Sequence, residues 1–419
     1  MPCIDSLWLP YTQMATAPAP LPVIGAAGVR ILLEDGRELI DGISSWWTMC
    51  HGYHHPHIRE AVKAQLDTLP HVMFAGLIHE PAHTLARRLA ALLPCDAQRR
   101  LDRVFFSESG SVSVEIALKM ALQFWRNQGQ QRTRFLAFRD GYHGDTLGAL
   151  SVTDPGNGFH DACAAYRVPQ LFADLPRDAA ACAALDDLLT AHAHEIAAAI
   201  VEPRVQGAGG MRFHDAATLA HLRAACDRHG VLLIADEIMT GFGRTGTLFA
   251  CESAGIVPDL LCLSKALTGG TLPLAATVAC SHVFAAFCSE RIEDAFMHGP
   301  TYMANPLACA AANASLDLFE REPRLAQVAA IETQMRGELA PCRNLPGVVD
   351  VRVQGAIGVV QLDAPSGHLC PGFIDRGVWV RPFGDIVYLM PPFVIEPADL
   401  EILTTVVCEV VADWSRQRG

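Results

Sequence analysis

The amino-acid sequence predicts an α/β fold, with a large domain of mainly parallel sheet sandwiched by helices and a smaller α+β domain. Short, almost wholly apolar runs alternate with helix-like segments through the middle of the chain, and this alternation favours a parallel sheet covered on both faces. From about residue 325 onward the pattern changes to one long helix, short strands and a final helix. The length of 419 residues also exceeds the size at which a single core usually stops growing.

Five apolar runs are the predicted strands of the large sheet, because a strand buried on both faces has no polar side. They are RVFFS (103–107), RFLAF (134–138), AAAIV (197–201), VLLIA (231–235) and DLLCL (259–263). Two segments between them have helical patterns. Residues 110–126 carry apolar side chains every four residues, and residues 217–229 form a helix that ends at Gly230.

The two ends of the chain complete the predicted organisation. Residues 28–41 predict a hairpin. Near the C-terminus we predict a helix, three strands and a last helix at residues 325–340, 348–353, 357–362, 378–380 and 397–415. The predicted domains are an N-terminal segment (1–51) that packs with the small domain, a large domain (52–320) and a small C-terminal domain (321–419).

Composition excludes several classes of protein. The formal net charge of -13 argues against a nucleic-acid surface. Charged residues make up only 18% of the chain, which suits a large core and a surface hidden in an oligomer. The apolar runs are too short to span a bilayer, and the N-terminus lacks the pattern of a signal peptide. The 14 scattered cysteines form no CxxC pair, so we expect reduced thiols in the cytoplasm.

Polar or reactive groups follow each of the five predicted strands. Ligands of open parallel sheets bind beyond the carboxyl ends of the strands, so we expect these groups to converge. In chain order, the groups are Ser109-Gly110-Ser111, Tyr142 in GYHGDT, Glu202, Asp236 and Lys265.

Each group has an ordinary explanation and a chemical one. The serine-glycine-serine stretch would serve as a helix cap, but free amides at a helix N-terminus also bind phosphate. Asp236 would suit a buried ion pair or a protonated pyridine nitrogen. Lys265 would suit the surface, but an enclosed amine has a lowered pKa and forms Schiff bases. Tyr142 would suit the core or would stack on a ring. Together the groups match the needs of pyridoxal phosphate.

The sequence resembles the class III pyridoxal-phosphate aminotransferases of fold type I over nearly its whole length. The signature stretch LLIADEIMTGFGRTGTLFACESAGIVPDLLCLSKALTGG ends in the turn around Lys265. The double tryptophan and the arginine of GVWVRPFG are typical of a subfamily that acts in biotin biosynthesis. Further similar stretches are LPYTQM (9–14), GISSWWTMCHGYHHP (42–56), SESGSVSVEIALKMALQFW (107–125), RDGYHGDTLGALSV (139–152), FMHGPTYMANPLACAAA (296–312) and GVWVRPFGDIVYLMPP (377–392).

The resemblance implies how the cofactor is bound. Lys265 would carry pyridoxal phosphate and move protons, and Asp236 would hold its pyridine nitrogen protonated. The resemblance also implies a homodimer with shared active sites, in which one subunit reaches the phosphate bound by the other. The remaining implied cofactor-binding residues are Gly110, Ser111, Tyr142, Pro300 and Thr301, the last reaching across to the partner.

The resemblance further implies transfer of the amino group of S-adenosylmethionine to 8-amino-7-oxononanoate, by ping-pong steps through pyridoxamine phosphate. Arg381 would pair with the carboxylate of the acceptor, and Tyr11 would take part in catalysis. Arg244 would influence recognition of the amino donor without touching it. The implied substrate-binding residues are Tyr11, Trp46, Trp47, Tyr142, Asp145, Lys265 and Arg381.

Several alternatives remain at this stage. The donor could be lysine, or the chain could be an ω-amino-acid transaminase, a mutase, a racemase or a non-catalytic relative. GFGRTG (241–246) formally matches a dinucleotide motif but follows its strand too late. HGYHHPHIRE (51–60) lacks the spacing of a metal site, so we expect no metal. Met239 and Glu108 depart from the family pattern without replacing a group that does chemistry.

Overall fold

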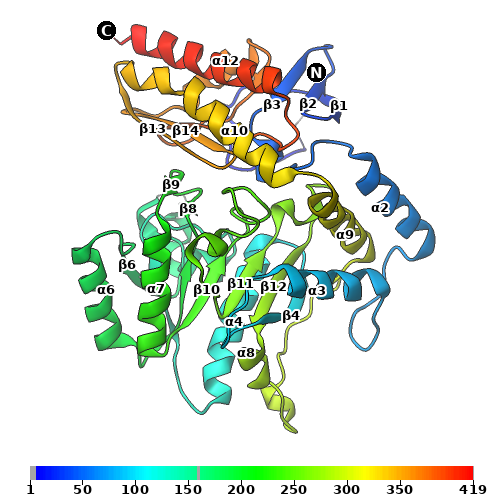
Figure 1. The fold of residues 1–419 in the computed structure, drawn as a ribbon, viewed down its shortest axis with the longest axis vertical. Coiled ribbons are helices and arrows are strands. Elements are labelled where there is room, and N and C mark those ends of the chain that lie inside the picture. The colour runs from blue at the N-terminus through cyan, green and yellow to red at the C-terminus, as the bar shows by residue number, and fades with distance from the viewer. Residues whose placement is uncertain (1–5, 158–160, 419) are drawn as a thin grey trace.

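The computed structural model describes residues 6–157 and 161–418, so the outermost residues of the predicted first and last domains lie outside it. Figure 1 shows a sheet flanked by helices at one end of the molecule. The first strands of the chain lie at the other end, beside the C-terminal helices. No helix in the described ranges is long and apolar enough to cross a membrane.

The large sheet has seven strands in the order β4-β12-β11-β10-β7-β5-β6. Every neighbouring pair is parallel except the two pairs made by β12, which runs antiparallel to β11 and β4. The predicted mainly parallel α/β fold is therefore confirmed. The strands are β4 (Leu101–Ser107), β5 (Arg134–Phe138), β6 (Leu171–Ala173), β7 (Ile196–Val201), β10 (Leu232–Asp236), β11 (Leu260–Leu263) and β12 (Ala275–Cys280).

All five predicted apolar runs are strands of this sheet. Both ends of each strand lie within about two residues of the predicted ends. Strands β6 and β12 of this sheet are not predicted from the sequence. All six residues of β12 are buried, as are all four residues of its neighbour β11. Its composition therefore resembles that of the parallel strands, and composition alone does not give the direction of a strand.

Helices cover the sheet and take their bounds from local caps. The long helix α4 (Gly110–Asn127) begins where the Ser109 side chain accepts the amide of Val112, and α7 (Ala216–His229) ends at Gly230 with a φ of 61°. The other helices before the C-terminal part are α1 (Ser44–Trp47), α2 (Pro56–Thr68), α3 (Glu80–Leu92), α5 (Leu147–Ser151), α6 (Ala179–His192), α8 (Ser281–Ala285) and α9 (Pro306–Arg321).

The N-terminal hairpin and the C-terminal part of the chain share a sheet. The predicted hairpin is formed by β2 and β3, and β3 also pairs in parallel with β15. The division into three domains stays a prediction, which this pairing supports. The elements are β1 (Val23–Ala27), β2 (Arg30–Leu33), β3 (Glu38–Asp41), β13 (Val348–Gln354), β14 (Ile357–Leu362), β15 (Val378–Trp379), β16 (Ile386–Leu389), α10 (Arg324–Glu338), α11 (Cys370–Ile374) and α12 (Pro397–Arg416).

Short elements complete the chain, and one of them carries Lys265. The two-stranded ribbon of β8 (Val205–Gln206) and β9 (Arg212–Phe213) follows β7. The 3-10 turns are η1 (Pro155–Asn157), η2 (Asp161–Tyr166), η3 (Ala250–Ala254), η4 (Lys265–Thr268), η5 (Ile292–Asp294), η6 (Ala340–Asn344) and η7 (Gly367–Leu369).

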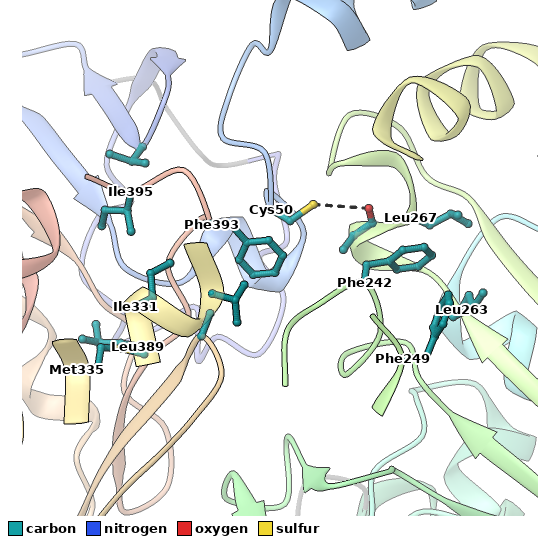
Figure 2. Packing of buried hydrophobic residues seen from close by; sticks show 14 of the residues in the cluster. Cys50, Phe242, Phe249, Leu263, Leu267, Ile331, Met335, Leu389, Phe393 and Ile395 are labelled. Carbon is teal, nitrogen blue, oxygen red and sulfur yellow. Dashed lines mark hydrogen bonds between the residues drawn. The ribbon is translucent and has the colours of Figure 1, made fainter. Parts of the chain in front are cut away.

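One apolar cluster connects the two ends of the molecule (Figure 2). Phe242 and Leu267 from the large-sheet side share this cluster with Phe393 from the C-terminal side. At its centre the Cys50 thiol donates a weak hydrogen bond to the carbonyl of Ala266, with 3.8 Å between the sulfur and the oxygen. The turn that begins at Lys265 is therefore anchored to both parts of the chain.

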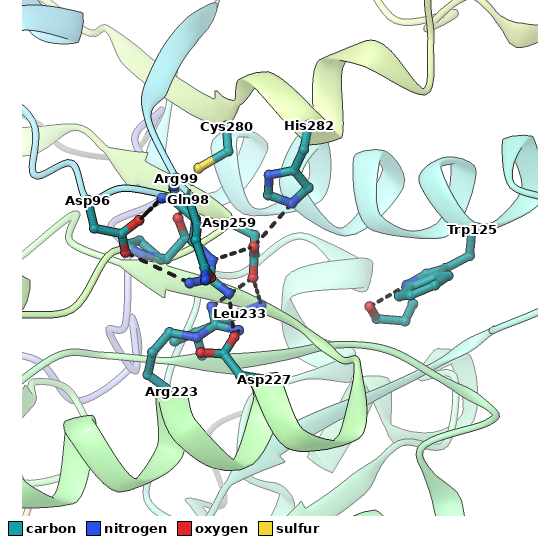
Figure 3. A network of polar contacts seen from close by, with 12 residues as sticks. Asp96, Gln98, Arg99, Trp125, Arg223, Asp227, Leu233, Asp259, Cys280 and His282 are labelled. Atoms are coloured by element: carbon teal, nitrogen blue, oxygen red, sulfur yellow. Dashed lines mark hydrogen bonds and ion pairs between the residues drawn. The ribbon is translucent and has the colours of Figure 1, made fainter.

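A buried carboxylate joins several elements at the edge of the sheet where β11 begins (Figure 3). Asp259 is 3% exposed and lies 2.7 Å from Arg223, 3.3 Å from Arg99 and 3.2 Å from His282. It also accepts the backbone amide of Leu233 at 2.7 Å. Burial alone would raise the pKa of Asp259, but His282, Arg223 and the Leu233 amide hold it well below its usual range.

We expect Asp259→Asn to lower the free energy of unfolding by about 3–5 kcal/mol, because it removes the buried charge that Arg223, Arg99 and His282 share. Because the pKa of Asp259 is lowered by folding, this stability is present above the ordinary carboxyl pKa and is lost as pH falls. Urea denaturation between pH 3 and pH 8 measures both effects. Asp363→Asn, which removes a half-exposed partner of Arg418, is the control and should cost less than about 1 kcal/mol. An equal loss of unfolding free energy in the two variants would contradict the role of Asp259.

Candidate active site

Lys265 lies where β11 leaves the sheet, as the first residue of η4. Its φ of 47° is in the left-handed region, an uncommon backbone conformation for a lysine that turns the chain sharply. Nζ lies 4.7 Å from the centre of the Trp47 ring, and no hydrogen bond to Nζ is found among the described residues. Burial lowers the pKa of the Lys265 amine, although Asp236 and Glu202 partly offset this effect. The site therefore holds an amine that is ready to lose its proton.

Asp236, the last residue of β10, faces the same site and is 5% exposed. Its Oδ2 lies 2.7 Å from Nδ1 of His143, and its Oδ1 accepts the amide of Ile238 at 3.1 Å. His143 is itself buried. A buried carboxylate held on one side by an imidazole and an amide keeps capacity to accept a further cationic donor.

The N-terminus of α4 forms a third wall of the site. Gly110 and Ser111 are the first two residues of this helix, whose first amides have no partner within the helix. The Ser111 hydroxyl accepts the amide of Asp145 at 3.1 Å. A Cβ atom at Gly144 would lie 2.1 Å from the Ser111 hydroxyl oxygen, so the loop comes this close only with glycine. The arrangement suits an anion such as phosphate.

These groups surround an inner cavity of about 210 Å³, next to an outer cavity of about 520 Å³. Both cavities are lined by Trp47, Tyr142, Ala208 and Lys265, so the lysine lies between them. The inner cavity is also lined by Ser109, Gly110, Ser111, His143, Gly144, Glu202, Asp236, Ile238, Met239 and Ser264. The outer cavity is also lined by Tyr11, Trp46, Asp145, Arg381, Pro382, Phe383, Gly384 and Tyr388.

Aromatic rings and one guanidinium build the outer cavity. The guanidinium of Arg381 lies 4.7 Å from the centre of the Trp46 ring, and the Tyr11 ring meets the Trp46 ring edge-on at 5.8 Å. The hydroxyls of Tyr11 and Tyr142 both donate to the carboxylate of Asp145. Burial and the Asp145 carboxylate raise the pKa of Tyr11 to about 12, so its hydroxyl keeps its proton at neutral pH.

Three residues for which the resemblance implied a role at the site lie away from these cavities. Pro300 and Thr301 line a separate cavity of about 620 Å³, together with Glu108. Arg244 is buried behind the site, where its Nη1 donates to the carbonyls of Ala356 and Pro391, and burial lowers its pKa to about 10. Within one chain, these side chains do not reach Lys265.

Comparison with known proteins assigns the family. The sequence profile of the family described as "Aminotransferase class-III" matches residues 11–411. The chain belongs to the class-III aminotransferases. The enzyme is thus an aminotransferase whose large sheet, lysine turn and buried aspartate lie where the sequence pattern predicted them.

Relatives of this aminotransferase are alike over almost their full length. The adenosylmethionine-8-amino-7-oxononanoate aminotransferase of Mycobacterium leprae is 46% identical, with 96% of this chain and 94% of that protein covered. The protein of the same name from Synechococcus elongatus is 44% identical, with 98% and 99% covered.

Solved structures agree with this assignment. The adenosylmethionine-8-amino-7-oxononanoate aminotransferase of Methanocaldococcus jannaschii, known from a crystal structure, has 32% sequence identity to this chain. The two structures superpose with a TM-score of 0.93 over 98% of this chain and 97% of that one. An amine transaminase from an uncultivated Pseudomonas species, solved in its PLP-bound form, is 33% identical with a TM-score of 0.90, covering 97% and 98%.

Two residues of the aminotransferase site have no role predicted from the sequence. His143 lies in the GYHGDT stretch, next to Tyr142, and its contact with Asp236 spans 93 positions. Glu202 directly follows a predicted strand, and it lines the inner cavity. Their positions in motifs at strand ends were the available signals. The contacts themselves depend on the fold.

Proposed function

We propose that this aminotransferase moves the amino group of S-adenosylmethionine to 8-amino-7-oxononanoate and so makes 7,8-diaminononanoate for biotin biosynthesis. The observation that carries the proposal is the outer cavity, in which aromatic walls and Arg381 adjoin Lys265. Broad aromatic faces suit an alkyl chain and a sulfonium cation, and a planar guanidinium suits a carboxylate. The names of the relatives support the same activity.

Pyridoxal phosphate is the cofactor in this proposal, and the residues of the inner cavity fit it. Lys265 offers an amine without a hydrogen-bond partner among the described residues, and Asp236 offers a buried carboxylate for the pyridine nitrogen. The first amides of α4, at Gly110 and Ser111, offer donors for the phosphate, and Tyr142 lies in the cavity wall. When bound, pyridoxal phosphate supplies an aldehyde that takes up amino groups and a ring that withdraws electrons.

The side chains of the enzyme then divide the remaining work. Lys265 Nζ removes the proton from the α-carbon of the donor, and later returns a proton to the carbon of the acceptor that receives nitrogen. Burial lowers the pKa of this amine, which increases the fraction of its neutral, basic form at a given pH. Tyr11 and Asp145 position the donor in the outer cavity, while Arg381 binds the carboxylate of the acceptor. Trp47 covers Lys265 and limits the access of water.

Absorption spectra of the purified enzyme with pyridoxal phosphate test the proposed function. The visible band of the bound cofactor should bleach with S-adenosylmethionine and return with 8-amino-7-oxononanoate. Lys265→Ala should hold no cofactor covalently and should show neither change. If the band bleaches with lysine but not with S-adenosylmethionine, lysine is the amino donor. Bleaching only with ω-amino acids, without recovery on adding the oxononanoate, would contradict the proposed substrates while leaving an aminotransferase.

We expect Arg381→Lys to raise the KM for 8-amino-7-oxononanoate by about 10- to 100-fold, because an ammonium cannot form the paired hydrogen bonds of a guanidinium. Bleaching of the cofactor by S-adenosylmethionine should change much less. Steady-state and half-reaction kinetics separate the two effects. Arg376→Lys, which alters an exposed arginine paired with Asp413, is the matched control. An unchanged KM in Arg381→Lys would exclude Arg381 as the carboxylate-binding residue.

The proposal includes a homodimer with shared active sites. Its support is that Pro300 and Thr301 line a cavity apart from Lys265, in a region where large apolar side chains such as Met297 and Tyr302 are exposed. Sedimentation equilibrium should give twice the chain mass of 45.2 kDa. Thr301→Ala should keep this mass but weaken pyridoxal phosphate binding about tenfold, unlike the exposed Thr333→Ala. A monomer that binds pyridoxal phosphate as tightly as wild type would contradict shared sites.

We also propose that the enzyme works in the cytoplasm. The 13 cysteines that the structure describes are all free thiols, which suits a reducing compartment.

A further inference from the structure

Glu202 carries a buried carboxyl group beside Lys265. The proposed mechanism gives Glu202 no role. It follows β7 directly, is 6% exposed and lines the inner cavity together with Lys265 and Asp236. Among the described residues, no arginine, lysine or histidine forms an ion pair with its side chain. Burying such a group is costly, so its retention at the reacting centre calls for an explanation.

The two oxygens of Glu202 hold two separate loops. Oε1 accepts the amide of Tyr142, which follows β5, at 3.0 Å. Oε2 accepts the amide of Gly207, which follows β8, at 2.9 Å. Tyr142 and Ala208, the neighbour of Gly207, line both the inner and the outer cavity. One side chain therefore fixes two segments that line both cavities beside Lys265.

The charge of Glu202 also acts on Lys265. Both Glu202 and Asp236 raise the pKa of the lysine amine against the effect of burial. Burial raises the pKa of Glu202 itself to about 7, with His143 lowering it and Asp236 raising it further. His214 contacts only the backbone carbonyl of Glu202, with its Nε2 at 3.0 Å. The ionisation of Glu202 is therefore moved toward neutral pH.

We propose that Glu202 is a positioning residue for amino transfer, which holds the Tyr142 loop and the Ala208 wall around Lys265 and keeps the lysine nitrogen basic. This inference rests on the proposed function, because it concerns the same lysine. The two effects are separable. The hydrogen bonds require two acceptor oxygens, whereas the effect on basicity requires a negative charge.

Glu202→Gln removes the charge and places an amide NH₂ against one of two backbone donors. With pyridoxal phosphate bound, the pH midpoint of its visible band should fall by about one unit, because the charge that favoured the protonated nitrogen is gone. Without cofactor, wild type should lose stability between about pH 4.5 and pH 7, because a raised carboxyl pKa gives stability below that range that is lost as pH rises. Glu202→Gln should lack this loss.

Glu237→Gln is the matched control. Glu237 is another fully buried carboxyl that accepts two backbone amides, from Ala250 and Cys251, but it lines neither cavity. The Glu237→Gln substitution should destabilise the protein without moving the pH midpoint of the visible band of the bound cofactor. An equal shift in both variants would overturn the proposal, because a general loss of structure would then explain it.

Glu202→Asp provides a second test if the glutamine variant does not fold. Its shorter side chain keeps the charge but cannot reach both amides, so kcat should fall about tenfold while the pH midpoint stays within about 0.3 unit of wild type. Unchanged kcat, or an unchanged midpoint in Glu202→Gln, would overturn the inference while the amino-transfer cycle still stands. Wild type that binds no pyridoxal phosphate would instead refute the proposed function itself.

Discussion

Parallel pairing among β7, β10 and β11 is the constraint on which the rest of the site depends. Asp236 pairs with Cys262 on one side, and the residue before Asp236 pairs with Val201 on the other. Glu202, Asp236 and Lys265 therefore leave the sheet at the same edge, within a few residues of a common level. A slip of one residue in this register would turn alternate side chains to the opposite face and would disperse the site. The apolar cores on both faces of the sheet hold the register in place.

A second set of contacts connects this edge to the remainder of the chain. The carbonyl of Ala266, next to the lysine, receives hydrogen bonds from Cys50 and Ser315. Gly269, which ends the turn with a φ of 58°, leaves no room for a side chain because a Cβ atom would lie 2.9 Å from Ile58. The lysine turn is thus fixed by residues that come before and after the large sheet in sequence. This explains how a strained backbone can persist at Lys265.

The sequence predicted those parts of the fold and the site that local pattern determines. Apolar runs located five strands, and polar groups at their ends located Lys265 and Asp236. The antiparallel direction of β12 was not predictable, because burial selects the same residue types in either direction. The contact of His143 with Asp236 was missed for a different reason: it joins two loops that only the folded sheet brings together. The roles of Pro300 and Thr301 concern a second subunit and stay predictions.

The junction of the two cavities has a kinetic consequence. Trp47, Tyr142, Ala208 and Lys265 line both compartments, so every molecule that reaches the lysine from the outer cavity occupies space that the next molecule also needs. Donor and acceptor consequently cannot bind at the same time. At high concentration the acceptor should fill the pocket before the cofactor carries nitrogen and so act as an inhibitor of its own conversion. The ratio of the two substrates should then affect the rate of the enzyme.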